Sequence, residues 1–323
     1  MQARRFVLAA AAVFAALAGA GAAGAQSFPV KPIRLIVPFA PGGATDILAR
    51  LIGQKLTEAW SQQVVVENRP GGGTVIGTDL VAKSAPDGYT LLMVSTSTVT
   101  VPTLLPKLPY DTLRDLAPVI QLVASPNVLA VHPSLPARSV RELIALARAR
   151  PNQVAFGSGG NGTSTHLGGE ILRLMADVGM VHVPYKGAAP STTAVLSGEV
   201  AWQFSAILST VPYLKSGRLR ALAVSSLKRS PVLPDVPPVA DTLPGFEASP
   251  WTGVAAPGGT SKELITRLNQ DIARALNARE TRERLTRDGN EVVAAPAEQF
   301  DAFFRAQMDK WAKVIRDAGI RLQ

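Results

Sequence analysis

The sequence contains no cysteine and only three histidines among its 323 residues. The absence of cysteine excludes disulfide bonds, thiolate metal ligands and a thiol nucleophile. Of the histidines, only His166 has a second metal-ligand type on the same helical face, Glu170. Two ligands without a third nearby make a weak metal site. We therefore predict no metal, and we interpret His166 as a residue that packs or forms a hydrogen bond near a helix start.

The motifs of common hydrolases and nucleotide-binding proteins are missing as well. A Gly-x-Ser-x-Gly elbow is excluded, because Phe156 precedes Ser158 and His166 follows Ser164 where glycine is needed. No Gly-Lys-Ser/Thr sequence completes a phosphate-binding loop. Residues 157–162 approach the dinucleotide-binding glycine spacing, but the match is loose and no ribose-binding acid follows. The sequence therefore predicts neither an enzyme nor a bound cofactor.

Long hydrophobic runs are confined to the N-terminus. Two arginines at positions 4 and 5, an apolar stretch at 6–17 and small residues at 23–25 form an export signal, which we expect to be cleaved after Ala25. A lipoprotein is excluded because no cysteine can be acylated. No later run is long enough to span a bilayer. A large exported domain without cysteine is typical of bacteria, so we expect a soluble protein of the periplasm.

Acidic residues are fewer than basic ones. The chain has 24 Asp and Glu against 33 Lys and Arg, a formal net charge of +9. The basic residues are scattered over expected helix faces, without the basic tail or aromatic–basic platform that would indicate a nucleic-acid partner. We expect no nucleic acid, and interpret the positive field as one that attracts anionic solutes.

Apolar strands alternate with helical patterns along most of the chain, which is typical of an α/β fold. Strands are expected at 33–39, 63–67, 89–94, 154–156, 181–183, 200–204, 220–224 and 252–256. Helices are expected at 45–59, 74–83, 140–150, 164–175, 188–196, 208–215, 261–278, 280–288 and 297–318.

Two segments predict a division into domains. The apolar strand expected at 117–131 is long enough to cross between domains, and the Pro-rich segment 231–250 lacks the periodicity of a helix or strand. We predict that residues 26–122 and 249–323 form domain 1 and that residues 123–248 form domain 2. Two connecting segments permit hinge closure around a ligand.

A glycine turn joins a strand to a helix twice, at residues 41–46 and 157–163. Such a turn leaves backbone N–H groups unpaired, and the helix dipole favours a negative charge beside them. We interpret Asp46, at the start of the first helix, as a capping residue rather than a ligand contact. The two turns predict two halves of the molecule that hold one small anion, although tight turning alone would also account for the glycines.

Polar residues follow two further strands. Ser95 to Thr98 come after the strand at 89–94, on the edge where open α/β sheets bind ligands. Their hydroxyl groups can donate to a carboxylate, and simple turn formation explains them equally well. Tyr185 and Lys186 follow the strand at 181–183. Phe39 and Tyr185 can supply apolar walls, whereas Lys186 can neutralise a ligand charge or remain a solvated loop residue.

The glycine- and proline-rich strand exits occur in a characteristic order from about residue 28 to the C-terminus. They are Val37-Pro38-Phe39-Ala40-Pro41-Gly42-Gly43 with Asp46 and Arg50, Asn68-Arg69-Pro70-Gly71-Gly72-Gly73, Pro86-Asp87-Gly88-Tyr89-Thr90-Leu91, Gly157-Ser158-Gly159 with Thr165-His166-Leu167, His182-Val183-Pro184-Tyr185-Lys186-Gly187, Leu219-Arg220-Ala221-Leu222-Ala223-Val224, and Trp251-Thr252-Gly253 with Ala256-Pro257. With these motifs the chain resembles the substrate-binding proteins of tripartite tricarboxylate transporters, the Bug or TctC-like group of Gram-negative bacteria.

The resemblance implies a two-domain periplasmic-binding-protein fold of type II-like form, with two parallel or mixed sheets flanked by helices, a hinge and an interdomain cleft. It implies a monomer that captures a small carboxylate for the membrane permease subunits of such a transporter. In this family backbone amides and hydroxyls of the cleft loops hold the carboxylate. The residues carried over by motif are Phe39, Gly42, Gly43, Thr45, Ser95, Ser158, Thr163, Ser164, Thr165, His166 and Tyr185.

One position departs from the family pattern. Many relatives carry Asp directly after the residue that matches Phe204, where this chain has Ser205. With Gln203 beside it, this wall would be neutral and would offer no partner to a ligand ammonium group. The hypothesis is a plain mono- or dicarboxylate, aromatic ones included, rather than an amino acid. Two alternatives stay open: an exported hydrolase or lyase on the same bilobal fold, and an orphan carboxylate sensor.

Overall fold

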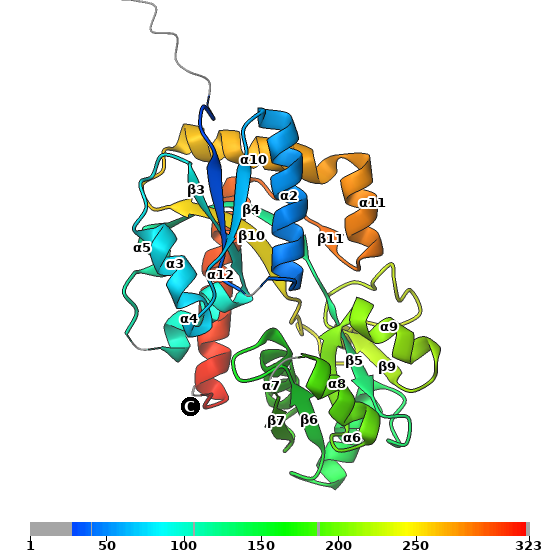
Figure 1. Cartoon of the computed structure of the whole chain (residues 1–323). Coiled ribbons are helices and arrows are strands. Elements are labelled where there is room, and N and C mark those ends of the chain that lie inside the picture. The colour runs from blue at the N-terminus through cyan, green and yellow to red at the C-terminus, as the bar shows by residue number, and fades with distance from the viewer. Residues whose placement is uncertain (1–27, 40, 106, 186–187, 321–323) are drawn as a thin grey trace, which may run out of the picture.

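The computed structural model describes residues 28–39, 41–105, 107–185 and 188–320, and Figure 1 shows them as two lobes. Each lobe is built on one mixed β-sheet flanked by helices. The predicted α/β fold with two mixed sheets is therefore confirmed. The export signal, its cleavage after Ala25, and Lys186 lie outside the described residues. Within the described part, no helix combines the length and apolar character needed to cross a membrane.

The first lobe contains a six-stranded sheet with the order β11-β4-β10-β3-β1-β2. Its strands are β1 (Ile33–Val37), β2 (Val64–Asn68), β3 (Thr90–Ser95), β4 (Leu116–Ala124), β10 (Trp251–Pro257) and β11 (Glu291–Val292). β1 pairs in parallel with β2 and β3, whereas β10 runs antiparallel to β3 and β4. The apolar run of β1 is almost wholly buried, as expected for a strand covered on both faces.

Helices cover both faces of this sheet (Figure 1). They are α2 (Ala44–Trp60), η2 (Gly72–Thr74), α3 (Val75–Ala82), α4 (Thr96–Leu104), α5 (Thr112–Asp115), α10 (Lys262–Asn277), α11 (Arg279–Arg287) and α12 (Ala297–Asp317). The sequence did not indicate α4, whose residues were interpreted as a polar strand exit and a proline-interrupted connection. Its polar and apolar residues are buried together, so it has no amphipathic pattern, and Pro102 lies inside it.

The second lobe contains a five-stranded sheet with the order β7-β6-β8-β5-β9. Its strands are β5 (Asn127–Val131), β6 (Ala155–Ser158), β7 (Val181–Pro184), β8 (Trp202–Ala206) and β9 (Arg220–Val224), and its helices are α6 (Val140–Ala149), α7 (Ser164–Ala176), α8 (Ala188–Ser197) and α9 (Ile207–Lys215). β6 is parallel to β7 and β8, so the loops that follow these three strands leave the sheet at one edge.

The chain crosses between the lobes twice. The single strand expected at 117–131 is wrong in one respect: Ser125 and Pro126 divide it into β4 of the first sheet and β5 of the second. Proline has no N–H for a continuous ladder, which explains the break. The N–H of Ser125 donates to the carbonyl of Pro250 at 2.8 Å, so the outgoing and returning segments run side by side. The domain boundaries given above stay a prediction.

The return segment 225–250 contains only one short helix, η3 (Val239–Asp241). After it, Trp251 packs edge-on against Phe300 and Phe304 of α12, with ring centroids 5.7 and 5.8 Å apart. α12 packs on β4 and α4 and also reaches α7 of the second lobe. Lys310 of α12 donates to the carbonyl and the carboxylate of Glu247, each at 2.6 Å. The C-terminal helix is therefore tied to the returning segment.

Candidate functional site

A hollow of about 290 Å³ lies between the lobes, where loops that leave parallel strands face one another. The first lobe contributes the exits of β1 and β2 and one face of α4, and the second lobe contributes the loop between β6 and α7. Its lining residues are Pro38, Phe39, Pro70, Gly71, Gly73, Thr74, Ser97, Thr100, Val101, Leu104, Asn161, Gly162 and Thr163. Of the predicted ligand residues, the structure places Phe39 and Thr163 together on this lining.

The first glycine loop leads from β1 into α2. Its Gly42 has a left-handed φ of +84°, and its N–H donates to Oδ2 of Asp46 at 2.9 Å. Gly43 is the N-cap residue and provides no side-chain cap. The N–H groups of Thr45 and Asp46, in the first turn of α2, have no acceptor among the described residues. These two groups, rather than that of Gly42, are open to an anion.

Asp46 is buried, with 2 % of its surface exposed. Besides the Gly42 amide, it accepts hydrogen bonds from Nε of Arg50 at 3.0 Å and from Nδ2 of Asn68 at 2.9 Å. Burial alone raises the pKa of Asp46, but the hydrogen bonds from Arg50, Gly42 and Asn68 outweigh it and lower this pKa to about 2. Asn68 also donates to the carbonyl of Phe39 at 3.1 Å. The carboxylate therefore holds the loop and does not face a ligand.

The second glycine loop leads from β6 into α7 and satisfies most of its own amides. The N–H of Gly159 donates to Oγ1 of Thr165 at 3.0 Å, and that of Gly160 donates to Oγ of Ser158 at 3.1 Å. The N–H of Gly162 donates to Nδ1 of His166 at 3.0 Å.

At the start of α7, Thr163 is the N-cap residue, and its hydroxyl accepts from the N–H of His166. The N–H groups of Ser164 and Thr165 have no acceptor among the described residues. As in α2, the open amides are those of the first helical turn.

A pair of histidine rings lies behind the second loop. His166 stacks on His182 of β7 with ring centroids 3.8 Å apart, and Nε2 of His182 lies 2.6 Å from Oγ of Ser158. Burial, then the neighbouring charges of His182 and Arg173, lower the pKa of His166 to about 3. Burial lowers the pKa of His182 to about 4. Both rings are therefore neutral at ordinary pH, and they support the loop from behind.

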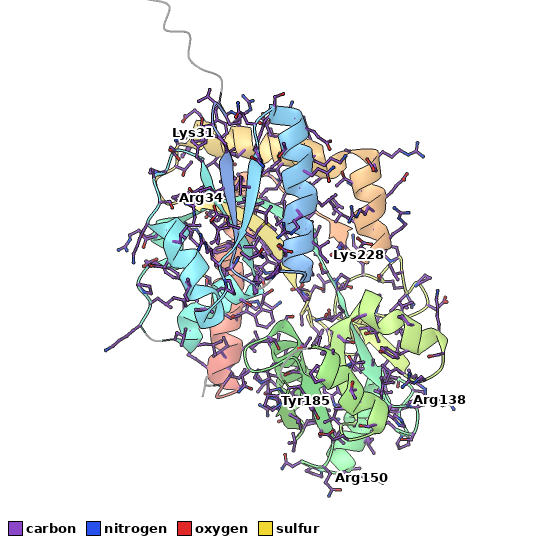
Figure 2. The ribbon with its side chains drawn as sticks, viewed as in Figure 1. Lys31, Arg34, Arg138, Arg150, Tyr185 and Lys228 are labelled. Atoms are coloured by element: carbon purple, nitrogen blue, oxygen red, sulfur yellow. The ribbon has the colours of Figure 1, made fainter. Side chains whose placement is uncertain are left out.

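Nine of the predicted ligand residues lie outside the lining: Gly42, Gly43, Thr45, Ser95, Ser158, Ser164, Thr165, His166 and Tyr185. The N–H of Ser95 is not free to donate to a ligand, because it already donates to Oγ1 of Thr98 at 3.1 Å. The Ser95 hydroxyl is buried without a partner among the described residues. The hydroxyl of Tyr185, labelled in Figure 2 on the second lobe, donates to Glu199 at 2.8 Å. Burial and this hydrogen bond raise the pKa of Tyr185 to about 12.

Two groups on the lining were absent from the predicted set. One is the exit of β2, where Gly71 and Gly73 have positive φ. Its signal was present, because a run of three glycines follows a strand that is parallel to β1. The other is the face of α4 with Ser97 and Thr100. Ser97 belongs to the polar run from Ser95 to Thr98 that was expected to offer donors, whereas Thr100 was not expected, because the helix that carries it has no recognisable period.

A second, largely apolar hollow of about 270 Å³ borders the same helix start. Ala44, Ile47 and Leu51 of α2 face Ile207 at the start of α9, and the crossing segments and α11 close the hollow. Ile47 keeps 48 % of its surface exposed. α2 thus begins near two hollows that are both lined mainly by apolar surface, and both touch the two lobes.

The wall at the end of β8 carries no charge. Ser205 is buried and its hydroxyl lies 2.6 Å from that of Thr210. Gln203 is buried too, bonded to Ser191 and Thr192. Neither Gln203 nor Ser205 lines either hollow, and their polar groups are satisfied within the lobe, so a neutral wall of the cleft stays a prediction.

The comparisons with known proteins agree on one family and cover most of the chain. The family model described as "Tripartite tricarboxylate transporter family receptor" matches residues 48–320. BugT of Bordetella pertussis is 40 % identical over 321 residues, which covers 98 % of each protein.

Solved structures of the same size are similar as well. Rpa4515 of R. palustris, determined with adipate, is 35 % identical, with a TM-score of 0.79 over 91 % of this chain and 99 % of that one. MatC of Rhodopseudomonas palustris, determined with bound malate, is 30 % identical, with a TM-score of 0.74 over 89 % of this chain and 100 % of that one.

Proposed function

Because the chain belongs to the tripartite tricarboxylate transporter receptor family, whose members are periplasmic solute-binding receptors and not enzymes, we propose a specific role for it. It captures a small carboxylate in the periplasm, without transforming it, and delivers it to the permease subunits of a tripartite tricarboxylate transporter. The export signal cleaved after Ala25 brings it to that compartment, and it acts as a monomer. The adipate and malate complexes of its relatives support a carboxylate as the ligand class.

One observation of the fold carries the proposal at the level of the site. The loops after β1 and β6, which belong to different sheets, line one hollow through Phe39 and Thr163. Beside each loop, the first turn of a helix has open N–H groups, those of Thr45 in α2 and of Ser164 in α7. Helix starts stabilise anions through such groups and through the helix dipole. A carboxylate between them would be held by both lobes.

The proposed contacts follow from this arrangement. Phe39 and Thr163 form walls, and the backbone N–H groups of Thr45, Asp46, Ser164 and Thr165 supply the donors, with Gly43 leaving room for close approach. The amide of Gly42, the hydroxyl of Ser158 and the ring of His166 support the loops from behind, since their hydrogen bonds lie within the protein. Ser95 and Tyr185 remain candidates only for a cleft that rearranges when ligand binds.

The chemistry of the ligand is narrowed by what surrounds the cleft. No carboxylate side chain lines the hollow of 290 Å³ among the described residues. The second hollow beside α2 is mainly apolar, and its one lining carboxylate among the described residues, Asp288, lies with Arg284 at the end of α11. We infer a mono- or dicarboxylate with an apolar aliphatic or aromatic body, in preference to an amino acid, whose ammonium group would lose water without gaining an acidic partner.

The decisive experiment is a thermal-shift screen of the mature protein with carboxylates and matched amino acids, followed by calorimetry. A ligand that binds only the folded protein raises the unfolding temperature in a dose-dependent manner. We expect succinate or adipate to bind at least tenfold more tightly than aspartate. Failure of every carboxylate to bind would contradict the receptor, and turnover of a bound compound would favour the hydrolase or lyase. Tighter binding of aspartate than of succinate or adipate would contradict only the argument that the cleft wall is neutral. It would leave the proposed receptor function intact.

A variant tests the first loop. Gly43 has φ −78° and ψ 167°, an extended conformation that any residue adopts. Gly43→Val should therefore leave α2 intact while its side chain blocks the approach of a carboxylate to the amide of Thr45. We expect calorimetry to record at least a tenfold loss of affinity with an unchanged unfolding temperature. Equal affinity would remove this loop from the site.

A further inference from the structure

The two glycine loops contain the same hydrogen bond in the same register. In the first, the N–H of Gly42 donates to the side chain of Asp46 at 2.9 Å. In the second, the N–H of Gly162 donates to the side chain of His166 at 3.0 Å. Each glycine lies one residue before the N-cap, and each acceptor is the third residue of the helix. The two lobes therefore fix their loops with one geometry and two different side chains.

The backbone conformation explains why this bond positions the loop. Gly42 and Gly162 have φ of +84° and +76°, a left-handed region that suits glycine. In that conformation each N–H turns back toward its own helix and is used by the side-chain acceptor. The N–H groups of the first helical turn stay free, and the bond fixes the direction in which they point.

We propose that Asp46 and His166 are paired positioning residues of the carboxylate site, each holding one glycine loop so that the open amides of its helix face the cleft. The inference rests on the proposed function, and it assigns to neither side chain a contact with the ligand. Their burial supports this, because only 2 % of Asp46 and 4 % of His166 is exposed.

The surroundings of His166 determine which of its ring nitrogens carries the proton. Nδ1 of His166 accepts the Gly162 hydrogen bond, so the proton of the neutral ring lies on Nε2. Nε2 lies 3.9 Å from Glu170, whose carboxylate is bonded to Arg173. The stacked His182 and its contact with Ser158 hold the ring plane. A proton on Nδ1 would break the bond to the loop.

The choice of an imidazole in one loop and a carboxylate in the other has an electrostatic reason. The charge of Asp46 is matched by Arg50 at 3.0 Å, so it adds little repulsion toward a bound anion. On α7 the nearby Arg173 is already paired with Glu170. A carboxylate in place of His166 would therefore stand unmatched beside the ligand, whereas a neutral ring accepts the same hydrogen bond without that cost.

The test compares two substitutions of one side chain. His166→Leu removes the acceptor, and His166→Asn keeps an acceptor oxygen near the position of Nδ1. Hydrogen exchange at the Gly162 amide reports the bond without any ligand, and calorimetry with adipate reports the site. We expect exchange at least tenfold faster and adipate affinity about tenfold weaker in His166→Leu, the loss expected for one hydrogen bond. His166→Asn should restore both to within about threefold of the wild type.

Two further variants complete the experiment. His132→Leu removes an imidazole whose ring is bonded to Ser134, outside the cleft lining, and should change neither measurement. If His166→Leu is too unstable to study, Asp46→Asn is used instead. It keeps an acceptor for Gly42 and should retain most of the affinity.

Normal Gly162 exchange and normal adipate affinity in folded His166→Leu would overturn the inference. Wild-type protein that binds no carboxylate would instead contradict the proposed function, while the exchange measurement would still test the hydrogen bond.

Discussion

The loop after β1 and the loop after β6 reach similar geometry by different chemistry. In the first lobe a buried carboxylate, Asp46, holds Gly42 and is itself held by Arg50 and Asn68. In the second lobe a neutral imidazole, His166, holds Gly162 and stacks on His182. What both preserve is a left-handed glycine followed by a helix start with open amides. The backbone direction is the common requirement, and the side chain that enforces it is free to differ.

This difference predicts that acid affects the two lobes in sequence. The pKa values of His166 and His182 are lowered from 6.5 to about 3 and about 4, so the unfolded chain takes up protons first as pH falls below 6.5. Stability is therefore lost as pH falls from 6.5 toward about 3, by about 2 kcal/mol at pH 5 for the buried His166 and by less for the partly solvated His182. The free energy of unfolding, measured by urea denaturation at pH 7.5 and at pH 5, gives this loss.

The first lobe should respond only in stronger acid. The pKa of Asp46 is lowered from 3.8 to about 2, so its contribution is present above pH 3.8 and lost as pH falls toward 2. A double variant, His166→Asn with His182→Gln, keeps hydrogen-bonding side chains but removes both imidazoles, and its stability should change little between pH 7.5 and 5. If its pH dependence equals that of the wild type, the histidine pair is not the acid-sensitive element.

Asp46→Ala should give the largest effect of a single substitution. It leaves the Gly42 amide, Asn68 and Arg50 without their common acceptor. Arg50 is half exposed and can be solvated, so we expect a loss of about 3 kcal/mol in the free energy of unfolding. Urea denaturation at pH 7.5 measures it, and Asp301→Ala, which removes an exposed partner of Arg305, is the matched control. An equally small loss in both variants would show that the buried carboxylate is dispensable.

Substitution of glycines that have positive φ should cost less stability than Asp46→Ala. It also separates the effect of backbone strain from the effect on ligand binding. Gly42→Ala, Gly162→Ala and Gly198→Ala each place a side chain at a φ between +76° and +84°, with a cost of about 1–2 kcal/mol in stability. Gly198 lies outside the two interlobe hollows. All three variants should lose similar stability, but only the first two should lose carboxylate affinity in calorimetry. A matching loss of affinity in Gly198→Ala would attribute the effect to general destabilisation.

The sequence predicted much of the fold because the decisive patterns are local. The apolar run of β1 and the amphipathic stripes of α10 and α12 place these elements within a few residues of their observed bounds. The break at Pro126 and the helix α4 were missed for physical reasons. An apolar strand has the same pattern whether it belongs to one sheet or to two. In α4, threonines are buried beside valines, so polar and apolar residues do not separate onto two faces and no helical period appears.

The site was predictable at the level of loops and not of atoms. The strand–glycine–helix pattern located both loops that border the cleft. It did not reveal that the Gly42 and Gly162 amides are already used, because that depends on side chains four residues later folding back. The interpretation of Asp46 as a capping residue is wrong in one respect, because its carboxylate accepts from Gly42, one residue before the N-cap, and α2 has no side-chain cap. The suggestion that His166 forms a hydrogen bond near its helix start agrees with the observed bond.

The central claim is that first-turn amides from both lobes hold one carboxylate. Its most direct test is an NMR titration of the mature protein with adipate, following the backbone N–H resonances of Thr45, Asp46, Ser164 and Thr165. The account predicts that all four resonances shift with a single dissociation constant equal to the calorimetric one. Shifts confined to one lobe, or unchanged resonances while calorimetry still records binding, would contradict it.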